Sequence, residues 1–116
     1  IKSKRFSIES KQFEEELKMK SMTPMEVENL LKEGKNPSII DVREVGEVAE
    51  GKIPGAVDIP LGLIEFRMNE LDKSKEYIMV CRSGGRSGQA SHFLASQGYN
   101  VINMDGGMLS WEGETE

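Results

Sequence analysis

The sequence predicts an α/β fold in which helices cover both faces of a mainly parallel sheet. Two observations lead to this prediction: short apolar runs of strand length alternate with segments whose apolar residues recur at helical spacing. Parallel strands are buried on both faces, so they appear in a sequence as short continuous apolar runs. The 116 residues, 37% hydrophobic and 30% charged, suit one domain with its own core.

The N-terminal segment differs from the rest of the chain. Residues 1–21 are highly charged with scattered apolar positions, so we expect an arm, helical or mobile, ahead of a folded domain at residues 22–116. Phe13 and Leu17 lie four residues apart, which allows a short helix. The sequence begins with Ile1 rather than Met, so whether a membrane anchor or other segment precedes it stays open.

Capping signals and apolar runs place the elements of the domain in order. The first predicted helix begins with an N-cap at Thr23, a proline at its first position, Pro24, and a capping-box glutamate, Glu26. Gly34 ends this helix. The predicted strands cover residues 38–42, 56–59, 77–80 and 101–104. The remaining predicted helices cover residues 45–51, 61–71, 87–98 and a short terminal segment that carries Trp111.

Composition and charge exclude several classes of function. A net charge of −5 disfavours a nucleic-acid binder, and no apolar run is long enough for a membrane span. One Cys and one His give no ligand cluster, so we expect neither a metal nor a cofactor. The single cysteine cannot form an internal disulfide and is either an inert core residue or a reduced thiol used for chemistry. The second case favours a cytoplasmic protein.

Cys81 is the strongest candidate for chemistry, because its surroundings favour a negative charge. It follows the predicted strand 77–80 directly, at the end of a parallel strand where the sites of such sheets form. Arg82 and Arg86 lie within five residues of it. A helix is expected to begin around Ser87, and the free N–H groups and dipole of a helix N-terminus favour an anion.

Two glycines shape the same loop. Gly84 and Gly85 let the backbone curl so that successive N–H groups point inward and form an anion-binding nest. Such settings lower a cysteine pKa from about 8.5 to roughly 3.5–7.5. A small core cysteine is the alternative interpretation, but two arginines and two glycines directly after it do not suit a core element.

Three segments of the sequence together resemble the rhodanese homology domain. They correspond to the first signature of that family, to its active-site loop and to its C-terminal signature. These are residues 41–44 with 50–56 and 59–60, residues 81–87, and Gly106-Gly107 followed by Trp111. The resemblance spans roughly residues 22 to 112. Lys52 departs from it, because the family often has His at that position.

The resemblance implies a five-stranded parallel sheet flanked by helices, and a thiosulfate sulfurtransferase without a cofactor. Cys81 would take the outer sulfur of a small anionic donor, thiosulfate or a persulfide, and pass it on from a Cys81 persulfide. The acceptor would be a thiol, cyanide or a protein. Substrate binding would fall to the arginines and the N–H groups of the loop, in residues Arg82, Ser83, Gly84, Gly85, Arg86 and Ser87.

Two other functions share parts of this pattern. Related phosphatases place Arg six positions after Cys, whereas Arg86 comes five positions after Cys81 and Ser87 takes the sixth. The smaller ring suits a single sulfur better than the tetrahedral oxyanion of a phosphatase or arsenate reductase. A non-catalytic rhodanese-like binding or regulatory module usually lacks the cysteine, which this chain retains together with both arginines.

Residues outside the loop are given supporting roles. Asp41 and Arg43, at the end of a predicted strand, are expected to tie adjacent loops together near the site. His92 follows the loop on a helix whose buried face its neighbours define, so we expect it to point to solvent. Residues 61–66, with Phe66 at their end, are hypothesised to border the pocket and to bias the choice of acceptor.

Overall fold

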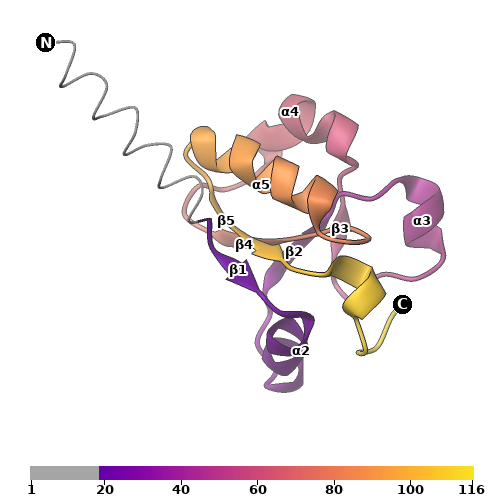
Figure 1. Ribbon diagram of the computed structural model, residues 1–116. Helices are drawn as coiled ribbons and strands as arrows, with labels where there is room; N and C mark the ends of the chain where they lie inside the picture. The colour runs from indigo at the N-terminus through magenta and orange to yellow at the C-terminus, as the bar shows by residue number, and fades with distance from the viewer. Residues whose placement is uncertain (1–18) are drawn as a thin grey trace, which may run out of the picture.

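A computed structural model describes residues 19–116 and confirms the predicted α/β fold, with helices on both faces of a five-stranded parallel sheet (Figure 1). The strands lie in the order β1-β5-β4-β2-β3, and every neighbouring pair is parallel. They are β1 Ser21–Met22, β2 Ser38–Asp41, β3 Val57–Asp58, β4 Glu76–Val80 and β5 Asn100–Met104. Four correspond to predicted strands. Of the predicted arm, residues 1–18 lie outside the described residues.

Strand β1 is the strand whose residues the sequence patterns did not identify, although the resemblance implied five strands. Ser21 and Met22 pair with Asn103 and Met104 of β5, and the Met22 carbonyl accepts a hydrogen bond of 2.9 Å from the Asp105 N–H. The sheet therefore begins at Ser21, within the segment predicted as an arm. A strand of two residues has no period from which a pattern can be recognised.

The helices lie in the predicted segments, but the extent of several of them differs from the prediction. They are α2 Pro24–Lys32, α3 Val45–Ala49, α4 Ile64–Arg67 and α5 Gly85–Ser96, with 3₁₀ turns η1 Leu61–Leu63, η2 Met68–Glu70 and η3 Gly107–Ser110. The predicted helix 61–71 is thus split into α4 and two flanking turns. The predicted terminal helix is the turn η3, which ends before Trp111. No helix within residues 19–116 is long and apolar enough to cross a membrane.

The capping box of α2 forms as predicted. The Thr23 hydroxyl accepts a hydrogen bond from the Glu26 N–H at 3.1 Å, and the Glu26 carboxylate accepts one from the Thr23 N–H at 3.0 Å. Gly34 follows the helix with a φ of 75°, in the left-handed region that favours glycine. Both ends of α2 are therefore set by local residues.

Two hydrophobic layers enclose the sheet, and the central strand β4 contributes alternately to both. Tyr77, Met79 and Cys81 belong to the layer under α4 and α5. Ile78 and Val80 belong to the opposite layer, with α2 and η3. Successive side chains of a strand point to opposite faces. This alternation places the Cys81 side chain on the α5 face of the sheet, at its carboxyl edge.

Candidate active site

The backbone around Cys81 is held by the C-terminal segment of the chain. The Cys81 and Arg82 carbonyls accept hydrogen bonds of 2.9 Å from the N–H groups of Met108 and Leu109. Gly107 allows this approach, because a Cβ atom there would lie 2.5 Å from both carbonyl oxygens. Its φ of 58° also lies in the left-handed region. The glycine pair of the C-terminal signature thus supports the loop directly.

The Cys81 sulfur is fully buried and receives hydrogen bonds from the start of α5. The Gly84 N–H donates to Sγ at 3.0 Å, and the Ser87 hydroxyl donates to it at 3.3 Å. Gly84 caps the helix with a φ of 102°, which a residue with a side chain rarely adopts. α5 begins at Gly85, two residues earlier than expected, so its first turn lies within the loop itself.

These hydrogen bonds favour the thiolate. Burial of the Cys81 side chain raises its pKa, but the Ser87 hydroxyl and the N–H groups of Ser87, Gly84 and Ser83 lower it, and the net pKa lies below the ordinary value. The N-terminal end of a 12-residue helix adds a favourable dipole. The arrangement stabilises a negative charge on sulfur without a histidine as general base.

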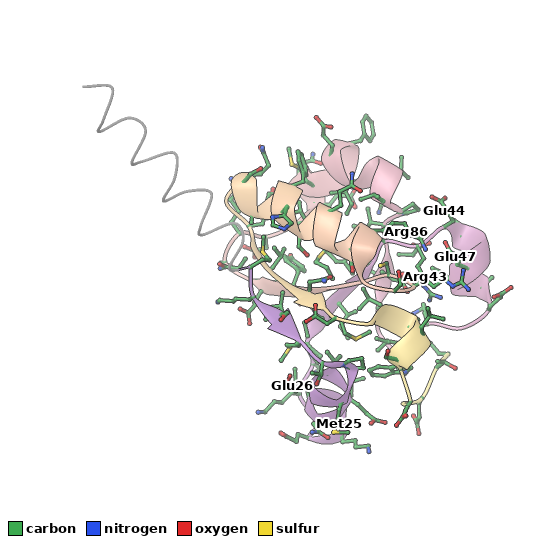
Figure 2. All side chains as sticks on the ribbon, in the orientation of Figure 1. Met25, Glu26, Arg43, Glu44, Glu47 and Arg86 are labelled. Atoms are coloured by element: carbon green, nitrogen blue, oxygen red, sulfur yellow. The ribbon has the colours of Figure 1, made fainter. Side chains whose placement is uncertain are left out.

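The two arginines of the loop lie in different environments. Arg82 is exposed, and its guanidinium makes no hydrogen bond within residues 19–116. Arg86 instead forms a bidentate ion pair with Glu47 of α3, Nη1 to Oε1 at 2.7 Å and Nη2 to Oε2 at 2.8 Å (Figure 2). The Arg86 guanidinium lowers the pKa of Glu47 to about 2.

Sequence reasoning did not identify Glu47 as a site residue. It lies 39 positions before Arg86, and no local spacing connects the two. The available signal was topological, since α3 follows β2 and the carboxyl ends of β2 and β4 meet at the same edge of the sheet.

Asp41 and Arg43 form a buried ion pair beside the loop. The Arg43 Nη2 and the Asp41 Oδ2 are 2.8 Å apart, and the Arg43 backbone N–H also donates to Asp41. The same guanidinium donates to the carbonyls of Gly51, at 2.8 Å, and of Glu47, at 3.4 Å. The pair therefore anchors the middle of α3 and the chain just after it, and Glu47 of this helix reaches Arg86 (Figure 2).

Asn103 of β5 is a second residue that the sequence did not single out. Its Nδ2 donates to the Gly84 carbonyl and to the Asp105 carboxylate, each at 3.3 Å. A Cβ atom at Gly84 would lie 3.3 Å from the Gly106 nitrogen, so a side chain there would be tightly packed as well as strained by the left-handed φ. The signal that was available is an asparagine among the apolar residues of the predicted strand 101–104.

The other residues considered from sequence lie around this centre. His92 is exposed on α5, as expected, and Phe66 on α4 is 84% exposed. Lys52 donates to the Ala56 carbonyl at 3.0 Å and pairs with Glu116. No group of three or more His, Cys, Asp or Glu side chains within residues 19–116 is arranged to hold a metal ion.

Comparison with known proteins identifies the family. The family model for the rhodanese-like domain matches residues 23–114. "Putative sulfurtransferase YtwF" of Bacillus subtilis is 54% identical over 78 residues, 67% of this chain and 76% of the relative. A sulfurtransferase of Allochromatium vinosum is 43% identical over 74 residues, 63% of this chain and 69% of its own.

A solved structure agrees with these sequence matches. The crystal structure of a rhodanese-like domain protein from Staphylococcus aureus superposes with a TM-score of 0.80 at 39% identity, covering 84% of this chain and 97% of the other. The segment matched by the family model includes β2 to β5, the Cys81 loop and the Gly106-Gly107 turn. The chain therefore belongs to the rhodanese-like domain family.

Proposed function

We propose that this chain is a thiosulfate sulfurtransferase that carries sulfur as a persulfide on Cys81. One observation carries the proposal: a buried cysteine sulfur accepts hydrogen bonds from the Gly84 N–H and the Ser87 hydroxyl at the start of a helix. A thiolate stabilised in this way is a nucleophile that needs no separate base.

The first half-reaction is a displacement at sulfur. The Cys81 thiolate attacks the outer sulfur of thiosulfate, and the sulfur–sulfur bond of the donor breaks. The electron pair of that bond leaves with sulfite, and the negative charge stays on the terminal sulfur of the new persulfide. A thiol persulfide reacts in the same way, with a thiolate as the leaving group. No proton has to move in the thiosulfate step.

The loop supplies the binding groups. Arg82 is exposed and, within residues 19–116, has no side-chain partner, so it can bind an anionic donor. Arg86 already binds Glu47, and a donor would have to share its guanidinium with that carboxylate. The N–H groups of residues 83–87 would receive the charge of the persulfide. In the second half-reaction a thiol, cyanide or a protein thiolate takes the terminal sulfur and regenerates Cys81. A reducing compartment such as the cytoplasm would keep the cysteine available.

Mass spectrometry after exposure to thiosulfate tests this proposal. We expect the intact protein to gain one sulfur atom, to lose it on addition of cyanide with release of thiocyanate, and to gain none as Cys81→Ser. A wild-type protein that takes up no sulfur from thiosulfate or from a thiol persulfide would be a non-catalytic module. Robust hydrolysis of an aryl phosphate that depends on Cys81 would instead identify a phosphatase.

The acceptor side has its own test. Phe66 is 84% exposed on α4, and we propose that residues 61–66 contact the acceptor. Replacement by alanine is expected to change the ratio of kcat/KM between cyanide and a bulky thiol. An unchanged ratio would contradict this role of the segment.

A further inference from the structure

The position of Glu47 has a consequence for the choice of sulfur donor. Its two carboxylate oxygens take both Nη atoms of Arg86, at 2.7 and 2.8 Å, and so occupy an edge with which a guanidinium can bind an oxyanion through two hydrogen bonds. The side chains are 35% and 32% exposed, so the pair lies where a donor can reach it. A donor that uses Arg86 has to compete with a carboxylate already in place.

Further charges act at the same edge of the sheet. The pKa of Arg86 is raised first by its bond to Glu47 and further by the negative charges of Cys81 and Glu44. With the thiolate formed, three negative groups therefore lie close enough to Arg86 to act on it, whereas Arg43, which also faces Glu47, is paired with Asp41. Figure 2 shows Glu44 and Glu47 projecting from the α3 region on the same side as Arg86. A donor that carries two negative charges meets more repulsion here than a donor that carries one.

We propose, on the basis of the sulfur transfer proposed above, that Glu47 sets donor selectivity by holding Arg86. It biases Cys81 toward singly charged donors, such as thiosulfonates and organic persulfides, over the dianion thiosulfate. Glu47 touches neither the sulfur nor the donor in this scheme; it is a positioning residue that acts through Arg86. Thiosulfate remains a substrate, but one that binds weakly.

Methanethiosulfonate and thiosulfate form a matched pair of donors for this question. Both offer the same outer sulfur, but the first carries one negative charge and the second carries two. The Cys81 thiolate forms a bond to the outer sulfur, and the donor's sulfur–sulfur bond breaks. The electron pair leaves with methanesulfinate or with sulfite. For each donor, the KM of a variant is divided by the KM of the wild-type protein. Comparing these two ratios isolates the effect of one unit of charge.

Glu47→Gln tests the inference, with Glu50→Gln as the control. In the wild-type protein the Glu44 N–H donates a hydrogen bond of 3.1 Å to the Glu47 carboxylate. Glutamine has the same size as glutamate and keeps a side-chain oxygen that can accept this bond. Glu50 is an exposed carboxylate at the end of the same helix, without a bond to Arg86. Glu47→Ala, which also frees Arg86, serves as a second variant in case the glutamine variant is unstable.

We expect Glu47→Gln to lower KM for both donors, and to lower KM for thiosulfate by a factor roughly 3- to 10-fold larger than the factor for methanethiosulfonate. This difference is the Coulomb effect of the additional charge on thiosulfate at a partly exposed site. The kcat values should change little, and the difference should shrink as added salt screens the charges. Glu50→Gln should leave the ratio of the two KM values unchanged.

Two outcomes would overturn the inference while leaving sulfur transfer intact. One is an unchanged ratio of KM values in Glu47→Gln although both donors still load Cys81. The other is a rise in KM for thiosulfate, which would mean that Glu47 presents Arg86 to the donor. No sulfur on wild-type Cys81 from either donor would instead overturn the proposed function, and this inference with it.

Discussion

Removing the Ser87 hydroxyl tests whether the loop activates Cys81. The hydroxyl is buried and lies 3.3 Å from the cysteine sulfur. A hydrogen bond to a charged group contributes about 1.5–3 kcal/mol, and its length here favours the lower end of that range. One pKa unit corresponds to about 1.4 kcal/mol, so Ser87→Ala should raise the pKa of Cys81 by about one unit.

The assay is the pH dependence of alkylation of Cys81 by iodoacetamide, supported by the ultraviolet absorbance of the thiolate. The midpoint should move to higher pH in Ser87→Ala, and the rate well below the midpoint should fall by about tenfold. Ser91→Ala is the matched control. Ser91 is equally buried on α5 and donates to the Ser87 carbonyl at 2.7 Å, with no bond to the sulfur. A midpoint that stays in place in Ser87→Ala, or that moves equally in both variants, would refute this account of activation.

Three further predictions concern stability. Gly107→Ala should lower the free energy of unfolding by roughly 3 kcal/mol in urea, because of its left-handed φ and the close carbonyls; Gly46→Ala, with nothing within 4 Å, should not destabilise. Asp41→Asn should cost about 3–5 kcal/mol, since it leaves the Arg43 charge buried and unpaired, and a cost below 1 kcal/mol would contradict this role. Because folding lowers the pKa of Glu47, the carboxylate stabilises the folded state fully above its ordinary pKa of 4.5, and this stabilisation is lost as the pH falls toward about 2. Over that interval, acid titration should therefore lower the free energy of unfolding of the wild-type protein more than that of Glu47→Gln.

Local signals in the sequence predicted those parts of the fold that depend on neighbouring residues. The capping box of α2 involves Thr23 and Glu26 alone, and it forms as expected. The Cys81 loop was recognisable because its two arginines and two glycines all lie within the five residues after the cysteine. Strand β1 could not be recognised, because Ser21 and Met22 are a strand only through pairing with β5.

The parts of the candidate site that escaped prediction all depend on contacts between distant segments. Glu47 meets Arg86 across 39 positions, and the Nδ2 of Asn103 reaches the Gly84 carbonyl across 19. Glu47 is one of several glutamates in its segment, and the amide of Asn103 marks an exception in an apolar strand without naming its partner. Their roles follow from the order of the strands, which brings α3, the Cys81 loop and the end of β5 to one edge of the sheet.

The hold of η3 on the Cys81 loop makes the site depend on a segment that follows the whole sheet in the sequence. Within the described residues, the carbonyls of Cys81 and Arg82 accept hydrogen bonds from the N–H groups of Met108 and Leu109. None of the strand pairings involves η3, so the sheet can form before the backbone of the loop is held. The last strand completes the sheet, and the turn that follows it completes the site.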